Sequence, residues 1–303
     1  MTDLTALQRN MSKLLPNIDL RFNEPMRLHT SFKIGGNAEI MAFPRTVTEL
    51  SQILESAKLL EIVPRILGAG TNILAPDAGV DGLVICLKDC LDGISLEGTH
   101  HIRVMSGVTM TRSAVFAANM GLSGLEFAHG IPGTVGGGVY MNAGAYGGEI
   151  ADVCESVEVM DESGRLLVIA KEDMDFRYRH SRLETNNLIV VSALFCLTPK
   201  DADEVKKTMK ELMARRSASQ PLDLPSAGSA FKRPKDGYAA ALIESAGLKG
   251  YRVGDAAISQ KHAGFAVNLG NAKASDVKKL LTDVSDIVYE KSGIRLEPEV
   301  RIW

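Results

Sequence analysis

Two glycine-rich segments are the residues best suited to holding a phosphate-bearing ligand. The loop 68–72 reads Gly-Ala-Gly-Thr-Asn, so its glycines could aim backbone N–H groups at a pyrophosphate while Thr71 and Asn72 add side-chain donors. The segment 121–148 holds ten of the chain's 28 glycines, which permit positive φ and close approach of backbone to ligand. Both segments predict a binding surface. Tight turns would use the same residues, and the first loop lacks the GxGxxG pattern of a Rossmann fold.

Paired charged residues in the second half of the chain are candidates for acid–base and anion chemistry. Arg177 and Arg179 each offer a planar guanidinium that matches a carboxylate, and on an extended segment both would face the same side. Glu297 and Glu299 have the same spacing in a predicted terminal strand. A carboxylate there could assist a developing enolate only if it were protonated or paired. The spacing alone does not choose within either pair.

A candidate proton donor lies in the Pro/Ser-rich loop 217–229. Ser226 and Ser229 both carry hydroxyls there. A serine hydroxyl is a very weak acid, so it could protonate only a strongly basic partner such as an enolate-like carbon. Nearby Lys232 or backbone N–H groups could then stabilise the alkoxide. Residue type alone leaves both serines open.

Hydrophobic periodicity predicts the elements that position these residues. The first part of the chain reads as a compact βαβ unit and the middle as α+β, with a small α/β module after a boundary near residue 200. We expect helices over 3–15, from 46 onward, over 111–120, 203–216 and 275–293, and strands over 38–43, 63–67, 82–87, 102–106, 156–160, 166–170, 188–197 and 296–303.

Specific residues predict where two of these helices begin and end. Thr46 followed by Glu49 has the spacing of a capping box, in which each side chain satisfies a backbone N–H of the first turn. Ser275 is the expected N-cap of the last helix, and Gly293 its end.

Composition narrows the function class. The net charge is −3 and no basic block is present, which disfavours nucleic-acid binding. No segment has the apolar core of a signal peptide or the length of a membrane span, so we expect a cytoplasmic protein with no membrane partner and no obligate protein partner. The four cysteines, Cys86, Cys90, Cys154 and Cys196, form no CxxC or zinc spacing, so we expect plain thiols and no metal site.

Several motifs in register resemble those of the UDP-N-acetylenolpyruvoylglucosamine reductase family. Three segments resemble its FAD-binding signatures and three resemble its catalytic segments, in the family's order. They are GAGTN at 68–72, GIPGTVGG at 130–137 and NAGAYG at 142–147, then RYRHS at 177–181, GSAFKRP at 228–234 and EPEVR at 297–301. The resemblance covers roughly residues 27–302, and by length the chain is similar to the shorter of the family's two types.

The resemblance implies a reaction and a set of residues. NADPH would reduce non-covalently bound FAD, which would reduce UDP-N-acetylglucosamine enolpyruvate to UDP-N-acetylmuramate in peptidoglycan precursor synthesis. Where residue type and spacing left two candidates, the resemblance selects one of them: Arg179 for the substrate carboxylate, Ser229 as proton donor and Glu299 as the third catalytic residue. It implies FAD contacts from Gly68, Ala69, Gly70, Thr71, Asn72, Gly133, Thr134, Gly136, Gly137, Asn142, Gly144 and Ala145. Substrate contacts are expected from Tyr178, Lys232, Arg233, Lys261, His262 and Asn268.

The resemblance also implies an α+β fold. A two-subdomain FAD-binding module of the vanillyl-alcohol-oxidase type would occupy residues 1–200, with subdomains at about 20–90 and 91–200. A small C-terminal α/β domain, 201–303, would bind the UDP-sugar. Two other functions fit the glycine loops: an FAD-linked oxidase of the same fold, and a non-catalytic nucleotide-binding module. The loop 68–72 contains no histidine to tether a flavin covalently, as several such oxidases do.

Overall fold

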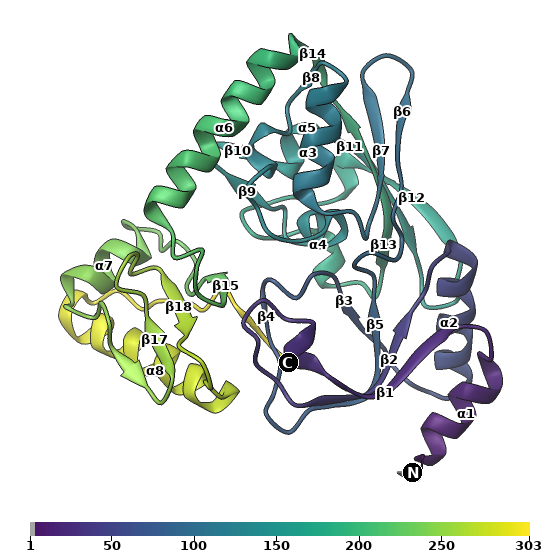
Figure 1. Cartoon of the computed structure of the whole chain (residues 1–303), viewed down its shortest axis with the longest axis horizontal. Helices are drawn as coiled ribbons and strands as arrows, with labels where there is room; N and C mark the ends of the chain where they lie inside the picture. Colours follow the sequence, from purple (N-terminus) through teal and green to yellow (C-terminus); the bar gives the residue numbers. More distant parts are fainter. Residues whose placement is uncertain (1–3) are drawn as a thin grey trace. The chain divides into compact units, whose positions relative to one another are not determined.

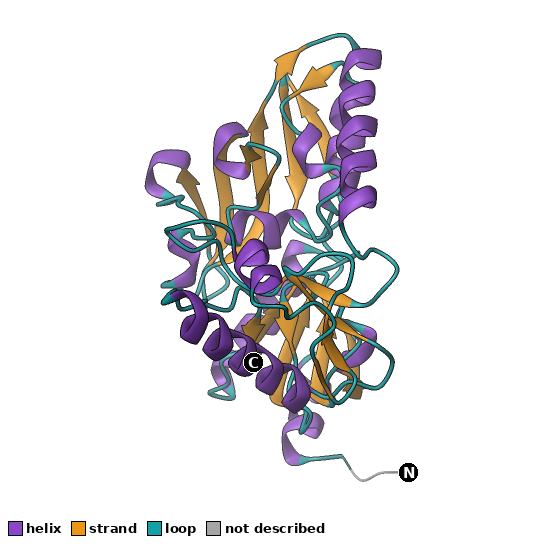
Figure 2. Cartoon of the chain, turned by 90° about the vertical axis from the view of Figure 1, so that its left-hand side faces the viewer, coloured by secondary structure: helices purple, strands orange, loops and turns teal. Residues whose placement is uncertain are grey.

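The chain forms two compact units, each made from several stretches of sequence. The computed structural model describes residues 4–303. The first unit comprises the residues up to Phe22 together with 40–69 and 82–215, and the second comprises 23–39, 70–81 and 216–303. Each combines sheets with helices (Figures 1 and 2). The predicted division at residue 200 stays a prediction.

A five-stranded antiparallel sheet is the main framework of the first unit. Its order is β12-β11-β13-β7-β6. The strands are β6 (Ile94–Glu97), β7 (His101–Met105), β11 (Cys154–Met160), β12 (Leu166–Ala170) and β13 (Ile189–Cys196). Helix α4 (Val135–Tyr140) packs on β13 and β7, and α3 (Met110–Asn119) packs on α4. This packing places the glycine-rich segment directly against the sheet.

Shorter elements complete this part of the first unit. Strand β8 (Leu122–Ser123) pairs with β14 (Thr198–Pro199), and β9 (Gly144–Ala145) pairs with β10 (Gly148–Glu149). Also present are α5 (Ile150–Val153), most of the long α6 (Ala202–Ser219) and the 3-10 turns Glu126–Ala128, Lys171–Asp173 and Arg182–Glu184, whereas the 3-10 turn Met26–Leu28 belongs to the second unit.

A second sheet has the order β1-β2-β5-β3. Its strands are β1 (Asp19–Pro25), β2 (Asn37–Phe43), β3 (Arg65–Leu67) and β5 (Val80–Cys86), of which β3 and β5 are parallel. Helices α1 (Ala6–Leu14) and α2 (Val47–Leu59) bury Met11, Leu50 and Ile53 in the core that Ile40 and Ile85 share. The expected βαβ unit is confirmed.

The capping box predicted for α2 is half right. The Thr46 hydroxyl accepts a hydrogen bond from the Glu49 backbone N–H (3.1 Å). The Glu49 carboxylate, however, accepts from the N–H of Arg45 (2.6 Å) rather than from that of Thr46. The Glu49 side chain therefore reaches one residue further back than the capping-box geometry requires.

The second unit contains a four-stranded antiparallel sheet of order β15-β18-β17-β16. The strands are β15 (Ser226–Ser229), β16 (Arg252–Val253), β17 (Ala256–Ile258) and β18 (Phe265–Asn268), and the helices are α7 (Ala239–Ser245) and α8 (Ala274–Ser292). Helix α8 packs on α7, β16 and β17. It buries Val277, Leu280 and Val284, so the predicted apolar stripe is confirmed.

The N-terminus of α8 corrects one prediction. Ser275 lies inside the helix and is not its cap. The Asp77 carboxylate accepts hydrogen bonds from the N–H groups of Ala274 (2.6 Å) and Ser275 (3.0 Å). A side chain distant in sequence thus satisfies donors that a local serine was expected to satisfy. Gly293, with φ 71°, ends the helix as predicted.

The last strand is shorter than predicted. Only Arg301–Ile302 form β19, which pairs in parallel with β4 (Ile73–Leu74). Residues 296–300 are irregular apart from a bridge between Pro298 and Phe231.

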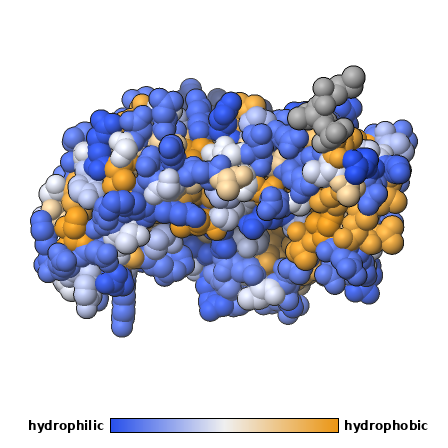
Figure 3. Space-filling view, turned by 90° about the horizontal axis from the view of Figure 1, so that it is seen from below, coloured by the Kyte–Doolittle hydropathy of each residue, from blue (hydrophilic) through white to orange (hydrophobic). Residues whose placement is uncertain are grey.

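Polar side chains predominate on the face of the molecule seen in Figure 3. Within residues 4–303 no helix combines the length and apolar character needed to cross a membrane.

Candidate active site

The two predicted FAD loops of the first unit meet at Gly68. A Cβ atom added to Gly68 would lie 2.6 Å from the Thr134 hydroxyl oxygen, closer than side chains tolerate. Thr134 is buried and begins α4, where its hydroxyl accepts a long hydrogen bond from the Gly137 N–H (3.4 Å). Glycine at position 68 is therefore required by the close approach of the two loops.

The glycines of α4 also pack tightly on the turn that follows β7. A Cβ at Gly136 would lie 2.9 Å from that of Ser106, and one at Gly138 would lie 2.7 Å from the sulfur of Met110. The Gly136 N–H donates to the Ser106 carbonyl (2.9 Å). Gly137 differs, because its nearest protein neighbour would be 3.7 Å away, an ordinary contact. Of the three glycines of α4, Gly137 alone has room for a side chain.

Two buried polar atoms next to this loop have no hydrogen-bond partner among the described residues. They are the hydroxyl oxygen of Ser106 and Nδ1 of His129. An unpaired buried polar atom costs free energy, and such atoms in a native protein call for an explanation. Their position beside the glycine-rich loop fits a polar ligand such as FAD. Ser106 was not predicted from the sequence, where the only signal was its place between a strand and Gly107.

In the second unit, the predicted FAD loop is tied to the C-terminal segment. The Asn72 side-chain amide donates to the Glu299 carbonyl (3.2 Å), and the Arg301 N–H donates to the Asn72 carbonyl (2.9 Å). Gly70 has φ 60°, and a Cβ there would lie 2.2 Å from the His29 carbonyl oxygen. The Asn72 amide, expected to face a pyrophosphate, also holds the backbone of a predicted catalytic residue.

The same C-terminal segment pairs with the segment that contains Ser229. The Glu299 N–H donates to the Ala230 carbonyl (2.9 Å), and the Lys232 N–H donates to the Glu297 carbonyl (2.8 Å). Ser229 ends β15 opposite Phe265 and is half-buried, as is Glu299. The structure thus brings the Ser229 and Glu299 segments together within the second unit. Ser226, the alternative donor, lies at the other end of the strand.

Arg179 lies in a tight turn rather than on the extended segment that was expected. Arg177 and His180 exchange two backbone hydrogen bonds (3.1 and 3.0 Å), with Tyr178 and Arg179 between them. Arg179 has φ 55°. A non-glycine residue in this region is strained, and such strain is often found at functional sites. The two arginines consequently do not share one side of a strand.

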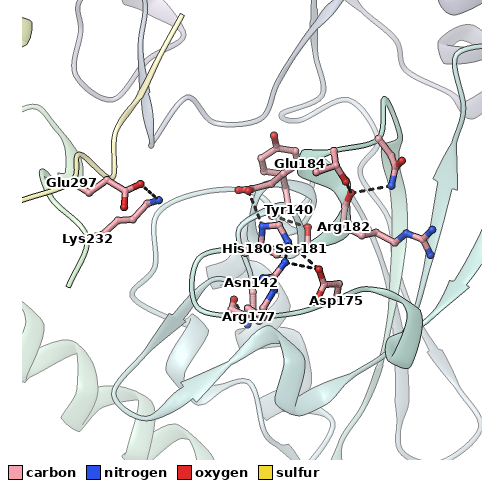
Figure 4. Close-up of polar contacts among 12 residues, drawn as sticks. Tyr140, Asn142, Asp175, Arg177, His180, Ser181, Arg182, Glu184, Lys232 and Glu297 are labelled. Carbon is pink, nitrogen blue, oxygen red and sulfur yellow. Dashed lines mark hydrogen bonds and ion pairs between the residues drawn. The ribbon is translucent and has the colours of Figure 1, made fainter. Parts of the chain in front are cut away.

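The Arg179 turn contacts the predicted FAD segment 142–147. The Arg179 guanidinium donates to the Gly144 carbonyl (3.4 Å), and the buried Asn142 amide donates to the Arg177 carbonyl (3.1 Å). The Ser181 hydroxyl donates to the Tyr140 carbonyl (2.8 Å), as Figure 4 shows. The Asn142 oxygen accepts from the Ala151 N–H (2.9 Å), so the amide links this turn to α5.

The surroundings of Arg177 distinguish it from Arg179. Its guanidinium is exposed and pairs with the Asp175 carboxylate (2.6 Å) and His180 (2.8 Å). His180 also contacts Glu184 (2.8 Å) in the same cluster (Figure 4). The side-chain hydrogen bond from Arg177, which outweighs slight desolvation, holds the pKa of Asp175 below its ordinary value. Arg177 is thus an ion-pair residue, whereas the half-buried Arg179 faces the FAD segment.

The predicted substrate residues Tyr178, Lys232 and Arg233 are accessible. The Tyr178 ring is exposed, with the Arg179 guanidinium carbon 5.2 Å from its centroid. Lys232 forms an ion pair with Glu297 (Figure 4), and Arg233 stacks 4.1 Å over the ring of Tyr238. The polar and aromatic groups of these residues thus lie at the surface. A nucleotide sugar could bind them there in place of their present protein partners.

The remaining predicted substrate residues differ in accessibility. Lys261 is exposed and donates to the Ser217 carbonyl (2.7 Å). Burial lowers the pKa of His262, and its Nδ1 accepts from the Gly264 N–H (3.0 Å), so the ring is neutral near pH 7. Asn268 is buried, donates to the Phe32 carbonyl (3.0 Å) and accepts from two backbone N–H groups. Its amide oxygen is thus fully occupied by the protein, and its role in substrate binding stays a prediction.

Comparison with known proteins establishes the family. A model of the C-terminal domain of UDP-N-acetylenolpyruvoylglucosamine reductase matches residues 220–303, and an FAD binding domain model matches residues 38–170. A relative of that name from Caldicellulosiruptor saccharolyticus is 48% identical over 97% of this chain and 94% of its own. The chain belongs to the UDP-N-acetylenolpyruvoylglucosamine reductase family.

Further relatives and a crystal structure agree. Reductases of this name from Caldanaerobacter subterraneus and Lactococcus lactis are 45% and 43% identical, each over at least 95% of both chains. The crystal structure of the enzyme from Thermus caldophilus superposes with a TM-score of 0.80 at 36% identity, covering 95% of this chain and 99% of that one. The expected α+β fold with an FAD-binding module is confirmed, and membership in this reductase family favours the reductase over the oxidase.

Proposed function

We propose that Arg179, Ser229 and Glu299 carry the reduction of UDP-N-acetylglucosamine enolpyruvate to UDP-N-acetylmuramate, the reaction of this family in peptidoglycan precursor synthesis. The observation that supports this most strongly is the contact between Arg179 and Gly144. It joins a strained arginine turn to an FAD signature segment within one unit. The division into an FAD-binding part (1–200) and a UDP-sugar part (201–303) belongs to the same proposal.

FAD fits the residues of the first unit. Gly68 and Gly136 let the loops pack closely, Gly137 leaves open space beside its backbone, and the unpaired hydroxyl of Ser106 lies next to this loop. The remaining predicted FAD residues, Ala69 to Asn72, Gly133, Thr134, Asn142, Gly144 and Ala145, would contribute mainly backbone groups. Bound FAD supplies the relay of hydride from NADPH to the β-carbon of the enolpyruvyl group.

Arg179 stabilises the charge that grows on the substrate carboxylate as the α-carbon becomes enolate-like. A guanidinium stays protonated at any working pH and matches a carboxylate with two parallel donors. The turn holds Arg179 rigidly, because the amide of Asn142 and the hydroxyl of Ser181 fix the backbone on either side of it. Such preorganised donors stabilise a transition state without reorganising.

Ser229 delivers the final proton to the α-carbon, and Glu299 supports that carbon's carboxylate as a hydrogen-bond donor. The pairing of the Glu299 N–H with the Ala230 carbonyl keeps the two segments in register. Tyr178, Lys232, Arg233, Lys261 and His262 bind the UDP-sugar, with the cations facing its diphosphate. The proposal includes action in the cytoplasm, where NADPH and nucleotide sugars are made, without nucleic acid, membrane or obligate protein partners.

The test is to incubate the purified protein anaerobically with NADPH and the enolpyruvyl ether and identify the product by mass spectrometry. We expect a product heavier by two hydrogens, formed in equal amount to the NADPH oxidised. In Ser229→Ala, turnover should fall by about 100-fold or more, the usual contribution of a general acid. Ser226→Ala is the matched control and should keep its activity; a larger loss in Ser226→Ala than in Ser229→Ala would move the proton donor to residue 226.

A further inference from the structure

Two histidines and a cysteine meet at one end of the five-stranded sheet of the first unit. His100 directly precedes β7, His101 begins it, and Cys196 ends β13; both strands are labelled in Figure 1. One ligand atom from each of the three lies within 4.8 Å of the others. None of the three belongs to the proposed reductase site.

Strand pairing explains why residues so far apart in sequence meet. Cys196 is the direct partner of His101 across the β13–β7 ladder, and directly opposed residues project their side chains to the same face. The Leu197 N–H donates to the His100 carbonyl (2.8 Å), which extends the pairing by one residue. The imidazole centroids are 4.4 Å apart, so both rings lie at the same edge. The cluster is therefore fixed by regular backbone structure.

A carboxylate and a hydroxyl orient the two rings. Glu155 is the extra residue of a β-bulge in β11, where Cys154 and Ser156 pair with the consecutive residues Phe195 and Leu194. Bulges redirect side chains, and the Glu155 carboxylate lies 2.8 Å from Nε2 of His101. The Thr99 hydroxyl lies 2.9 Å from Nδ1 of His100. These contacts leave Nδ1 of His101 and Nε2 of His100 for another partner.

We propose that His100, His101 and Cys196 form a binding site for zinc(II). Imidazole nitrogen and thiolate sulfur are its preferred ligands, and three protein ligands with a fourth position open to water is a common arrangement. A histidine that hydrogen-bonds to a carboxylate through its other nitrogen is typical of zinc sites. Cys196 is exposed and both histidines are half-buried, so an ion can enter from solvent. Binding releases the Cys196 thiol proton to the buffer.

The first experiment is equilibrium dialysis of the FAD-loaded protein against zinc(II), with elemental analysis of the bound metal. We expect one zinc per chain that is lost in Cys196→Ser and in His101→Ala. The controls are Cys90→Ser and His29→Ala, a cysteine and a histidine outside the cluster, which should keep the zinc. Unchanged flavin content shows that each variant is folded. Retention of the zinc in both cluster variants, or no zinc bound at micromolar concentration, overturns the proposal.

Substitution of Glu155, the bulge residue, gives an independent test of the zinc site. Glu155→Gln keeps the size of the side chain but removes its charge, and loss of such an orienting carboxylate usually weakens metal binding by about 10- to 100-fold. Zinc should also protect Cys196 from alkylation by iodoacetamide in the wild-type protein, read by mass spectrometry. An unchanged zinc affinity in Glu155→Gln together with no protection of Cys196 would contradict the assigned ligands.

Discussion

The side-chain amide of Asn72 donates a 3.2 Å hydrogen bond to the backbone carbonyl of Glu299. On its other side, the Glu299 N–H donates to the Ala230 carbonyl, directly after Ser229. One residue of a predicted cofactor loop thus fixes the backbone of a predicted catalytic glutamate, and the segment paired with that glutamate carries the predicted proton donor. Asn72 therefore acts as a positioning residue in addition to its predicted place in the FAD loop.

This relationship predicts the effect of Asn72→Ala. Without the amide, the Glu299 backbone loses one of its two fixed hydrogen bonds, and misplacement of a catalytic group by about 1 Å can cost about 100-fold in rate. We expect kcat to fall by roughly that factor, with KM for NADPH little changed. Steady-state kinetics with both substrates measures this. An unchanged kcat would show that Glu299 is held by other contacts or is not catalytic.

The different surroundings of Arg179 and Arg177 predict different consequences of the same substitution. Arg179→Lys removes the two-pronged donor and should lower kcat by about 100-fold or more, as loss of a transition-state donor commonly does. Arg177→Lys can still pair with Asp175, and exposed ion pairs contribute little, so only a few-fold change is expected. Flavin content should stay constant in both. Similar losses in the two variants would reject the assignment to Arg179 alone.

Alanine substitutions at two glycines distinguish a role in protein packing from a role in FAD binding. Gly68→Ala creates a 2.6 Å contact with Thr134, so both folding stability and FAD binding should decline. At Gly137 the protein has room for a methyl group, and alanine in place of glycine favours a helix by about 1 kcal/mol. Gly137→Ala should therefore lose FAD affinity without loss of stability. The measurements are flavin titration and thermal unfolding of the apoprotein; full FAD affinity in Gly137→Ala would place the cofactor elsewhere.

The cap of α8 predicts a pH dependence of stability. Burial raises the pKa of Asp77, but hydrogen bonds from the Ser275 and Ala274 backbone outweigh it, so the pKa lies below its ordinary value. The ionised carboxylate therefore stabilises the fold above the ordinary aspartate pKa of about 3.9, and this contribution is lost as pH falls toward the lower folded pKa.

Asp77→Ala should cost about 1 kcal/mol at pH 7, the usual value for a helix cap. Denaturant unfolding of the wild type and the variant between pH 7 and pH 3 should show this difference shrinking below about pH 4. The conservative Asp77→Asn keeps an acceptor and should retain part of the stabilisation. A difference independent of pH would show that the carboxylate charge does not contribute.

Local patterns predicted most elements of the fold, but not the contacts between distant segments. The stripe Val277, Leu280 and Val284 and the stop at Gly293 follow from periodicity and backbone chemistry, and both were confirmed. The cap of α8 was wrong because Asp77 comes from a segment nearly two hundred residues away, which no local pattern reveals. The predicted terminal strand was too long, because alternation of residue types could not show that only Arg301–Ile302 pair with another strand, β4.

The candidate site shows the same limit. Glycine motifs identified the loops, yet not that Gly68 approaches Thr134 or that Ser106 is left unpaired beside them. The arginine pair was expected on an extended segment, whereas the hydrogen bonds of Asn142 and Ser181 hold a turn there. Cys196 looked like a plain thiol because strand pairing, not spacing, brings His100 and His101 to it.

Anaerobic flavin spectroscopy can show whether this one protein performs both halves of the reduction, from NADPH to FAD and from FAD to the enolpyruvyl ether. The FAD-loaded protein is titrated with NADPH and the enolpyruvyl ether is then added. We expect NADPH to bleach the oxidised flavin bands and the ether to restore them. In Ser229→Ala the bands should bleach normally but recover far more slowly. Bands that return only with oxygen, or a protein that holds no flavin, would contradict this expectation.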